Sequence, residues 1–248
     1  MMLFARSILL LNIVTLCFTP PLFADLVIGG SATIEFDTSS SMFSSLALDR
    51  FYGTGSGVDS ATGTEITAGT GGGVDLSSSS GLVNLNHTVN GASVTNPDAR
   101  RGRQATNADI DTTSAATIAA SWSSNEQFGI DGVTRFSTVQ GPFVLGDFAV
   151  TFDSLNTRLT LVNNFDFPNS PTFYVDTPTF VTAANGFTAS GDLRIGSTLG
   201  LFGFSVGDDV GFFNLNATTA VPEPSSGVLL SMSSLGLALM RRRKLLAR

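Results

Sequence analysis

The chain has very few residues of the kinds that carry covalent or metal chemistry. Its 248 residues include one cysteine, Cys17, and one histidine, His87. A disulfide needs two cysteines and a thiolate metal site needs several, so both are excluded, as is catalysis by a cysteine in the middle of the chain. A Ser-His-Asp triad would have to be built around His87, and no Gly-x-Ser-x-Gly motif surrounds any serine.

Positive charge is scarce as well. Residues 25 to 220 contain no lysine and seven arginines against 19 Asp and Glu residues, a formal net charge of −12. Neutralising the phosphates of a nucleic acid requires clustered cations, so this composition excludes nucleic-acid binding. A strongly negative balance of this kind favours solubility and takes over the role that edge lysines have in many β proteins.

The first 24 residues have the pattern of an export signal. Arg6 precedes an apolar stretch from Ser7 to Phe18, and Pro20 and Pro21 end that stretch. The stretch is about a dozen residues long, whereas a membrane-spanning helix needs roughly 20. We therefore expect residues 1–24 to be a signal peptide that signal peptidase removes after Ala24.

The last 28 residues combine three features in a fixed order. A proline-containing motif cannot be helical, because proline fixes φ and restricts the residue before it. An uncharged apolar segment, residues 227–240, follows and predicts a short transmembrane helix. Four cations then favour a cytoplasmic end, which places everything before Ser225 on the other side of the membrane. The motif comprises Val221, Pro222, Glu223 and Pro224 within residues 221–226, and the basic anchor comprises Arg241, Arg242, Arg243 and Lys244 within residues 241–248.

This combination resembles the PEP-CTERM sorting signal of exported proteins in Gram-negative bacteria. The resemblance covers residues 221–248 and implies processing by an exosortase-type membrane transpeptidase, which cuts near the motif and removes the span. It also implies an inner-membrane-anchored precursor that is later displayed at the cell surface or in the extracellular matrix. Proteins of that kind are often associated with extracellular polysaccharide.

Between the two ends, apolar residues recur with a period of two and are separated by turn-forming residues, which predicts about ten β-strands. Four stripes show the pattern: Ala32, Ile34 and Phe36; Val83, Leu85 and Val89; Val144, Phe148, Val150 and Phe152; Phe187, Ala189, Leu193 and Ile195. We expect residues 25–220 to form an all-β domain, an antiparallel β-sandwich of the jelly-roll type whose phenylalanines fill the core.

Three departures from this strand pattern are expected. Residues 41–52 could hold a short helix. Residues 53–80 and 94–113 are predicted to be loops, because they are rich in Gly, Ser and Thr or contain proline. The second loop carries Arg100, Arg101 and Arg103, which we interpret as an exposed segment, with an anion-binding site as the alternative.

Two residues with chemical potential are better explained by packing. His87 falls on the apolar face of its strand, where a hydrogen-bonded structural histidine is commoner than a catalytic one. Trp122 shares a face with Ile118 and Ala120, which favours a core position over a platform for stacking sugars.

Acid pairs are the remaining catalytic candidates. Asp109 and Asp111 point the same way on an extended chain and could serve glycoside hydrolysis, while Asp208 and Asp209 point in opposite directions. All four lie in turn-like polar sequence, which indicates solvated loops, and no calcium-loop motif is present. We therefore expect no metal and no cofactor.

The sequence favours a non-enzymatic exported surface or matrix protein associated with exopolysaccharide. Its partners would be signal peptidase, the transpeptidase, the membrane before processing, and polysaccharide. A carbohydrate-binding β-sandwich module and a secreted glycoside hydrolase are the alternatives, and fold analogy alone does not choose among the three.

Overall fold

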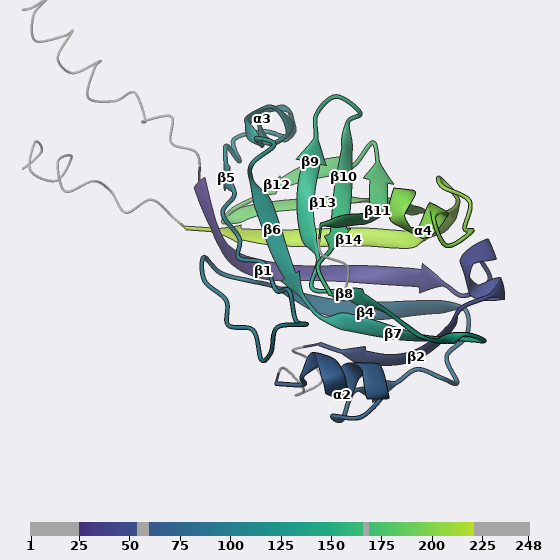
Figure 1. Cartoon of the computed structure of the whole chain (residues 1–248). Helices are drawn as coiled ribbons and strands as arrows, with labels where there is room; N and C mark the ends of the chain where they lie inside the picture. Colours follow the sequence, from purple (N-terminus) through teal and green to yellow (C-terminus); the bar gives the residue numbers. More distant parts are fainter. Residues whose placement is uncertain (1–24, 54–59, 166–168, 221–248) are drawn as a thin grey trace, which may run out of the picture. The chain divides into compact units, whose positions relative to one another are not determined.

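The computed structural model describes residues 25–53, 60–165 and 169–220 (Figure 1). The signal peptide, its cleavage after Ala24, the sorting motif, the transmembrane helix and the basic anchor fall on residues 1–24 and 221–248, outside the described residues. Within the described ranges, none of the helices combines the length and apolar character that crossing a membrane requires.

Strands dominate the described part of the chain, and the helices between them are short. The strands are β1 (Asp25–Asp37), β2 (Ala47–Tyr52), β3 (Val74–Asp75), β4 (Leu82–Val89), β5 (Asp109–Ile110), β6 (Gln127–Asp131), β7 (Val133–Thr138), β8 (Gly141–Gly146), β9 (Ala149–Asp153), β10 (Arg158–Asn163), β11 (Ser170–Asp176), β12 (Thr179–Ala183), β13 (Gly186–Ile195) and β14 (Asp209–Thr219). The helical segments are η1 (Ser41–Ser44), α2 (Gly63–Ala68), α3 (Ala115–Ser121) and α4 (Ser197–Gly200).

The larger sheet closes on itself. Its strand order is β11-β10-β9-β6-β4-β1-β14-β13-β12, with β5 paired to β1, and a further pairing of β11 with β13 joins eight of the strands into a ring. Strand β13 makes this closure because one of its edges is long enough to pair with two strands. Residues 186–190 pair with β12, and residues 193–195 pair with β11. The prediction of an all-β chain with antiparallel sheets is confirmed, but this sheet is closed where a jelly-roll sandwich would keep it open.

A second sheet of four strands, in the order β3-β2-β7-β8, packs against the closed one. Some of its apolar side chains enter the same core as those of β1, β4 and β14, namely Leu48, Phe51, Phe136 and Leu145. Others, Tyr52, Val133 and Val144, form a smaller cluster with Ala61, Ile66 and Phe165. The two sheets therefore share one large core, and the second sheet also buries a smaller one.

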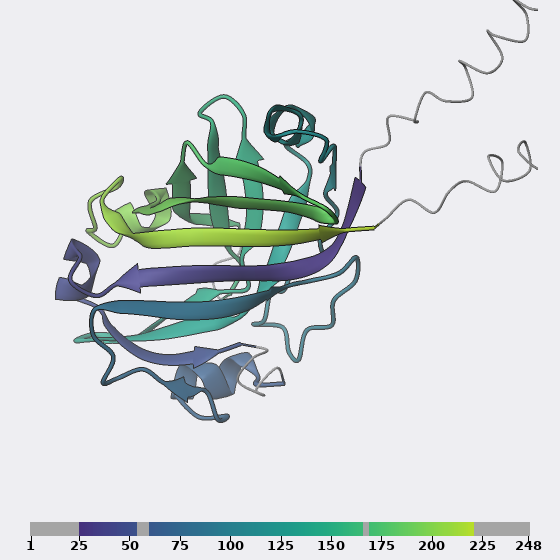
Figure 2. The ribbon, with the colours of Figure 1, turned by 180° about the vertical axis from the view of Figure 1, so that it is seen from behind.

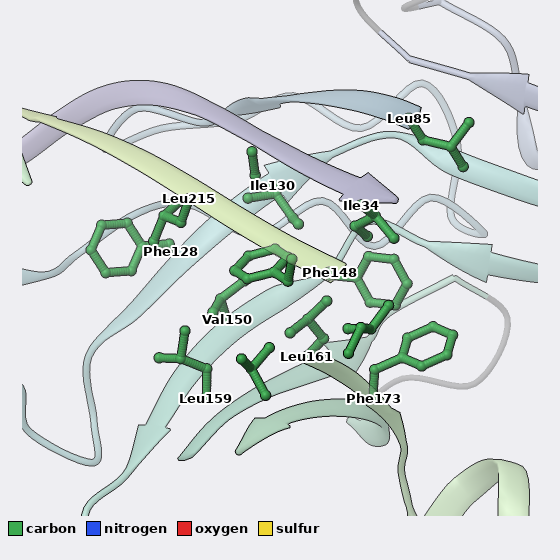
Figure 3. Close-up of a cluster of buried hydrophobic side chains, with 14 of the residues drawn as sticks. Ile34, Leu85, Phe128, Ile130, Phe148, Val150, Leu159, Leu161, Phe173 and Leu215 are labelled. Carbon is green, nitrogen blue, oxygen red and sulfur yellow. The ribbon is translucent and has the colours of Figure 1, made fainter. Parts of the chain in front are cut away.

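Alternation along the strands builds this interior. On β1, Ala32, Ile34 and Phe36 are each at most 2% exposed, while the residues between them face outward. Phenylalanine supplies most of the large buried side chains, and many of the rings meet edge to face, as where Phe148 and Phe173 lie 6.1 Å apart at 61° (Figure 3). That geometry is the one aromatic quadrupoles favour. The prediction that phenylalanine fills the core is confirmed.

One predicted stripe is divided between the two sheets. Val144 lies on β8 of the four-stranded sheet, whereas Val150 and Phe152 lie on β9 of the closed sheet. The chain turns between them at Asp147, which has a left-handed φ of 47°. A residue in that conformation ends a strand, so the apparent single stripe becomes two strands.

One of the expected loops, residues 53–80, contains a helix, and another helix follows the second expected loop, residues 94–113. Helix α2 begins at a capping box made by Thr62 and Glu65 and ends at Gly69, whose φ is 74°. Helix α3 begins at a second capping box, and Trp122 follows it as the C-cap residue, where a strand was expected. Residues 41–52 hold only the 3-10 turn η1 before strand β2.

Candidate functional site

A regular array of polar side chains covers the outward side of four adjacent strands of the closed sheet. Strands β4, β1 and β14 cross the near side of the molecule in Figure 2, and β13 lies beside β14. Because side chains alternate along a strand, every second residue of these strands faces outward. We call twelve of these positions, three from each strand, the polar face.

Antiparallel register arranges the polar face in three rows that cross the four strands. The first row is Thr88, Ser31, Asn216 and Thr188; the second is Asn86, Thr33, Asn214 and Ser190; the third is Asn84, Glu35, Phe212 and Asp192. Nine of the twelve side chains are Ser, Thr or Asn, so the face presents uncharged hydrogen-bond donors and acceptors at regular spacing.

Two features give the polar face direction. The third row carries both carboxylates, Glu35 and Asp192, so one end of the face is acidic. Phe212 lies between their strands with 39% of its surface exposed, which places one aromatic ring among the polar groups. In the second row, the hydroxyl of Thr33 donates to Oδ1 of Asn86 over 3.1 Å.

A second cluster lies inside the molecule, and we call it the arginine clasp: Arg101, Arg103, Asp131 and Asp147. The guanidinium of Arg101 donates to both carboxylate oxygens of Asp147, from Nε over 2.7 Å and from Nη2 over 2.9 Å. Nη2 also donates to Asp131 Oδ1 over 3.0 Å, and Nη1 donates to the carbonyl of Ala61 over 2.9 Å. Arg103 Nε lies 2.9 Å from the same oxygen of Asp131.

The arginine clasp is a structural device. Arg101 is 2% exposed and Asp147 is fully buried, so neither can meet a ligand from solvent. A buried charge is tolerated when it is paired and hydrogen-bonded, as both of these are. The prediction that Arg101 belongs to an exposed segment is wrong, because its carboxylate partners lie in the interior; Arg100, the residue before it, is exposed.

His87 has the structural role that the sequence predicts. Its side chain is 2% exposed, and Nδ1 lies 3.0 Å from the carbonyl oxygen of Asp131. A carbonyl only accepts, so Nδ1 carries the proton and donates. Burial lowers the pKa of His87 to about 4, against the opposing effect of the Asp131 carbonyl. The imidazole is therefore neutral at physiological pH.

The other predicted residues also have local partners. Trp122 is 3% exposed, packs on Phe128 and donates from Nε1 to the carbonyl of Glu126, so the prediction of a core tryptophan is confirmed. Asp111 accepts from the backbone of Thr113, and that hydrogen-bonding residue lowers the pKa of Asp111.

Asp109 is exposed on the short strand β5. Asp208, in the turn before β14, accepts from the hydroxyl of Ser41, and Asp209, the exposed first residue of β14, accepts from the backbone of Gly211. Within the described ranges, no group of three or more His, Cys, Asp or Glu residues is arranged to hold a metal ion.

A cleft of about 680 Å³ lies where the β7–β8 turn meets the segment after α4 and the residues after η1. We call it the end cleft. Its lining residues are Ser44, Ser45, Leu46, Thr138, Val139, Gln140, Gly141, Pro142, Phe143, Phe202, Gly203 and Phe204. None of the twelve is ionisable, so the end cleft cannot perform acid–base chemistry with its own side chains.

The fold and these surfaces define a structural class: an antiparallel β protein with one closed sheet, a buried ion-pair cluster and a mostly uncharged polar outer face. No protein-family model, no curated protein and no solved structure matches the chain. The function is therefore inferred from the side chains that the surfaces present.

Proposed function

We propose that the chain is an exported, non-enzymatic surface or matrix protein that associates with polysaccharide through the polar face. The observation that carries this proposal is the regular array of nine Ser, Thr and Asn side chains across four strands. Hydroxyl and carboxamide groups match the hydroxyls of a polysaccharide, both as donors and as acceptors. The array lies on regular strands, so its groups are held in position before a ligand arrives.

Delivery to the surface is the part of the proposal that rests on the sequence. The PEP-CTERM-like motif at Val221 to Pro224 and the basic anchor at Arg241 to Lys244 support sorting by an exosortase-type transpeptidase after signal peptidase has cut behind Ala24. The precursor would be anchored in the inner membrane and the processed form displayed outside.

Two arrangements speak for a binding protein over a hydrolase. Glycoside hydrolysis needs two carboxyls that flank a bound sugar, about 5 to 9 Å apart. Asp109 and Asp111 are instead part of β5 and the turn after it, where the carboxylate of Asp111 bonds its own turn. The end cleft, a hollow lined by the β7–β8 turn, residues 44–46 and residues 202–204, contains no carboxylate.

A carbohydrate-recognition module with a single preferred glycan is the second candidate, and Phe212 favours it. An exposed ring beside hydrogen-bonding groups can stack on the apolar face of a sugar. A glycan array separates the two functions: a recognition module binds one structure, whereas a matrix protein binds a broad set of neutral polysaccharides.

Processing is tested by mass spectrometry of the full chain expressed in a host that has an exosortase-type transpeptidase. We expect the surface form to lack residues 1–24 and 227–248. A surface form that retains the apolar segment and the basic anchor contradicts the sorting part of the proposal.

Association is tested by sedimenting that surface form with insoluble neutral polysaccharide at low and high salt. We expect binding to persist at high salt, because the groups involved are uncharged. The double variant Asn86→Asp/Asn214→Asp keeps the shapes of the side chains but adds two charges, and we expect it to bind at least tenfold more weakly. The control Asn125→Asp/Thr182→Asp adds the same charge at exposed positions outside the polar face. Equal binding by both variants would reject the polar face as the site.

A further inference from the structure

The end cleft has the dimensions of a small-molecule site. Its volume of about 680 Å³ lies within the roughly 300–1,000 Å³ that ligand pockets commonly occupy. Three segments distant in sequence form its walls: residues 44–46, residues 138–143 and residues 202–204. It shares none of its lining residues with the polar face.

Aromatic rings form one part of the wall. Phe143 and Phe202 lie with their centroids 5.2 Å apart at an interplanar angle of 65°, an edge-to-face pair. Phe202 keeps half of its surface exposed although it belongs to this pair. A ring that is held by a neighbour and still open to solvent offers a surface on which a flat apolar ligand face can stack.

Polar groups without charge form the other part. Ser44 and Ser45 contribute hydroxyls, and because the Ser44 hydroxyl donates to the carbonyl of Ser41 over 2.7 Å, it can only accept from a ligand. Gln140 contributes an exposed carboxamide beside the turn, with its Oε1 3.4 Å from the hydroxyl of Thr138 and its amide group as a donor. Thr138 is already engaged, since its hydroxyl donates to the carbonyl of Gly141 over 2.7 Å and so holds the β7–β8 turn in shape. The cleft thus combines stacking surface with neutral hydrogen-bonding groups.

This combination excludes most ligand classes. A phosphate, carboxylate or ammonium group would lose hydration in the cleft without gaining an ionic partner from any of the twelve lining residues. A purely aliphatic ligand would displace water from the hydroxyl and carboxamide groups and offer them no hydrogen bond in its place. The remaining class is a neutral ring that has an apolar face and a polar rim, and a sugar ring has both.

We propose that the end cleft is a second binding site, which takes a single neutral sugar ring such as the end or a branch of a glycan chain. The choice of a sugar rests on the proposed function, whereas the requirement for a neutral ring rests on the cleft alone. Phe202 stacks on the ring, and Gln140 with Ser44 and Ser45 bonds its hydroxyls.

The test uses saturation-transfer NMR of the surface form with methyl glycosides of glucose, galactose and N-acetylglucosamine, and with methyl glucuronide as the charged comparison. We expect binding of at least one neutral glycoside and none of the glucuronide. Phe202→Ala should weaken that binding about tenfold through loss of stacking, and Phe202→Tyr should restore it.

The matched control is Leu201→Ala, which removes an apolar side chain that is 87% exposed on the same segment but does not line the cleft. Leu201→Ala should bind like the unchanged protein. Absence of glycoside binding in the unchanged protein, or unchanged binding by Phe202→Ala, would overturn the inference.

The two proposals fail separately. Binding of glycosides that survives Asn86→Asp/Asn214→Asp but not Phe202→Ala supports the end cleft whatever the polysaccharide sedimentation shows. Loss of polysaccharide association alone contradicts the proposed function and leaves the cleft in place.

Discussion

The polar face and the arginine clasp distribute polarity in opposite ways. The clasp places four charged side chains where little water reaches, with Arg101 and Asp147 at most 2% exposed. The polar face exposes a dozen side chains to water and is mostly uncharged. Buried charges must satisfy one another and are costly to disturb, whereas exposed neutral groups exchange protein partners for water at little cost.

This contrast separates stability from binding in the molecule. The clasp ties residues 101–103 to Asp131 on β6 and Asp147 before β9, so it anchors a long connection to the closed sheet. The polar face makes few internal bonds and is available to a ligand. Changes in the clasp should therefore alter unfolding, and changes in the face should alter binding.

The largest effect is expected for Arg101→Met. The substitution leaves the carboxylate of Asp147 buried without the Arg101 guanidinium, while Asp131 keeps Arg103, and breaking a buried pair of this kind costs about 3–5 kcal/mol. Urea unfolding measures the loss. Arg100→Met is the control, since Arg100 is exposed next to it, and should change the free energy of unfolding by less than about 0.5 kcal/mol. Similar small decreases in the free energy of unfolding in both variants would show that the clasp does not stabilise the fold.

The second effect is the dependence of the free energy of unfolding on pH. It arises at His87, which contacts the carbonyl of Asp131. The folded-state pKa of His87 is about 4 and its ordinary value is 6.5, so between these values the unfolded chain binds more protons. The neutral histidine makes its full contribution to the free energy of unfolding above pH 6.5. As the pH falls toward 4 this contribution is lost, and the free energy of unfolding decreases by about 3 kcal/mol in total.

His87→Gln should abolish that dependence while leaving the carboxylates in place. Urea midpoints of both proteins from pH 7 to pH 4 make the comparison, and the NMR titration of the His87 ring should have its midpoint near pH 4. The carboxyls with lowered pKa, such as Asp111, lose their contribution only at lower pH. A midpoint near 6.5 would show that the ring is hydrated in the folded protein.

A third, intermediate effect is expected at Gly102, between the two clasp arginines. A Cβ at this position would lie 1.9 Å from the carbonyl oxygen of Asn164, so the chain would have to move. Gly102→Ala should cost about 1–3 kcal/mol, the usual range for overpacking. At Gly91 the nearest atom to an added Cβ is 3.8 Å away, so Gly91→Ala should be nearly neutral in the same urea experiment.

Strand alternation made the core and the outward rows predictable, because burial selects every second residue. Periodicity alone places Ile34 and Leu85 in the interior and therefore the residues beside them, Thr33 and Asn86, on the opposite, solvent-facing side. Which strands become neighbours was not predictable, since pairing of β1 with β14 joins residues that are far apart in sequence, from Phe36 with Gly211 to Val27 with Thr219. The sequence therefore indicates which residues of each strand face outward, but not the rows that these residues form across the four strands.

The clasp and the helices were missed for different reasons. Nothing in the order Arg100-Arg101-Gly102-Arg103 indicates which arginine meets buried carboxylates, because its partners come from β6 and from the turn before β9. Helix α2 did have a local signal. Thr62 with Glu65 three residues later is a capping-box pattern, but the surrounding glycines and serines favoured a loop.

The smallest effect on stability is expected on the polar face itself, where Thr33→Val removes the hydroxyl that donates to Asn86. Valine has the same branched shape and suits a strand, and the carboxamide of Asn86 can bond water instead, so unfolding should change by less than about 0.5 kcal/mol. Ile34→Val, one residue along and facing the core, should cost about 1 kcal/mol. In polysaccharide sedimentation the order should reverse, with Thr33→Val weakening association and Ile34→Val leaving it unchanged. If Thr33→Val proved as destabilising as Ile34→Val, the polar face would be part of the molecule's structural support, and its separation from the clasp would fail.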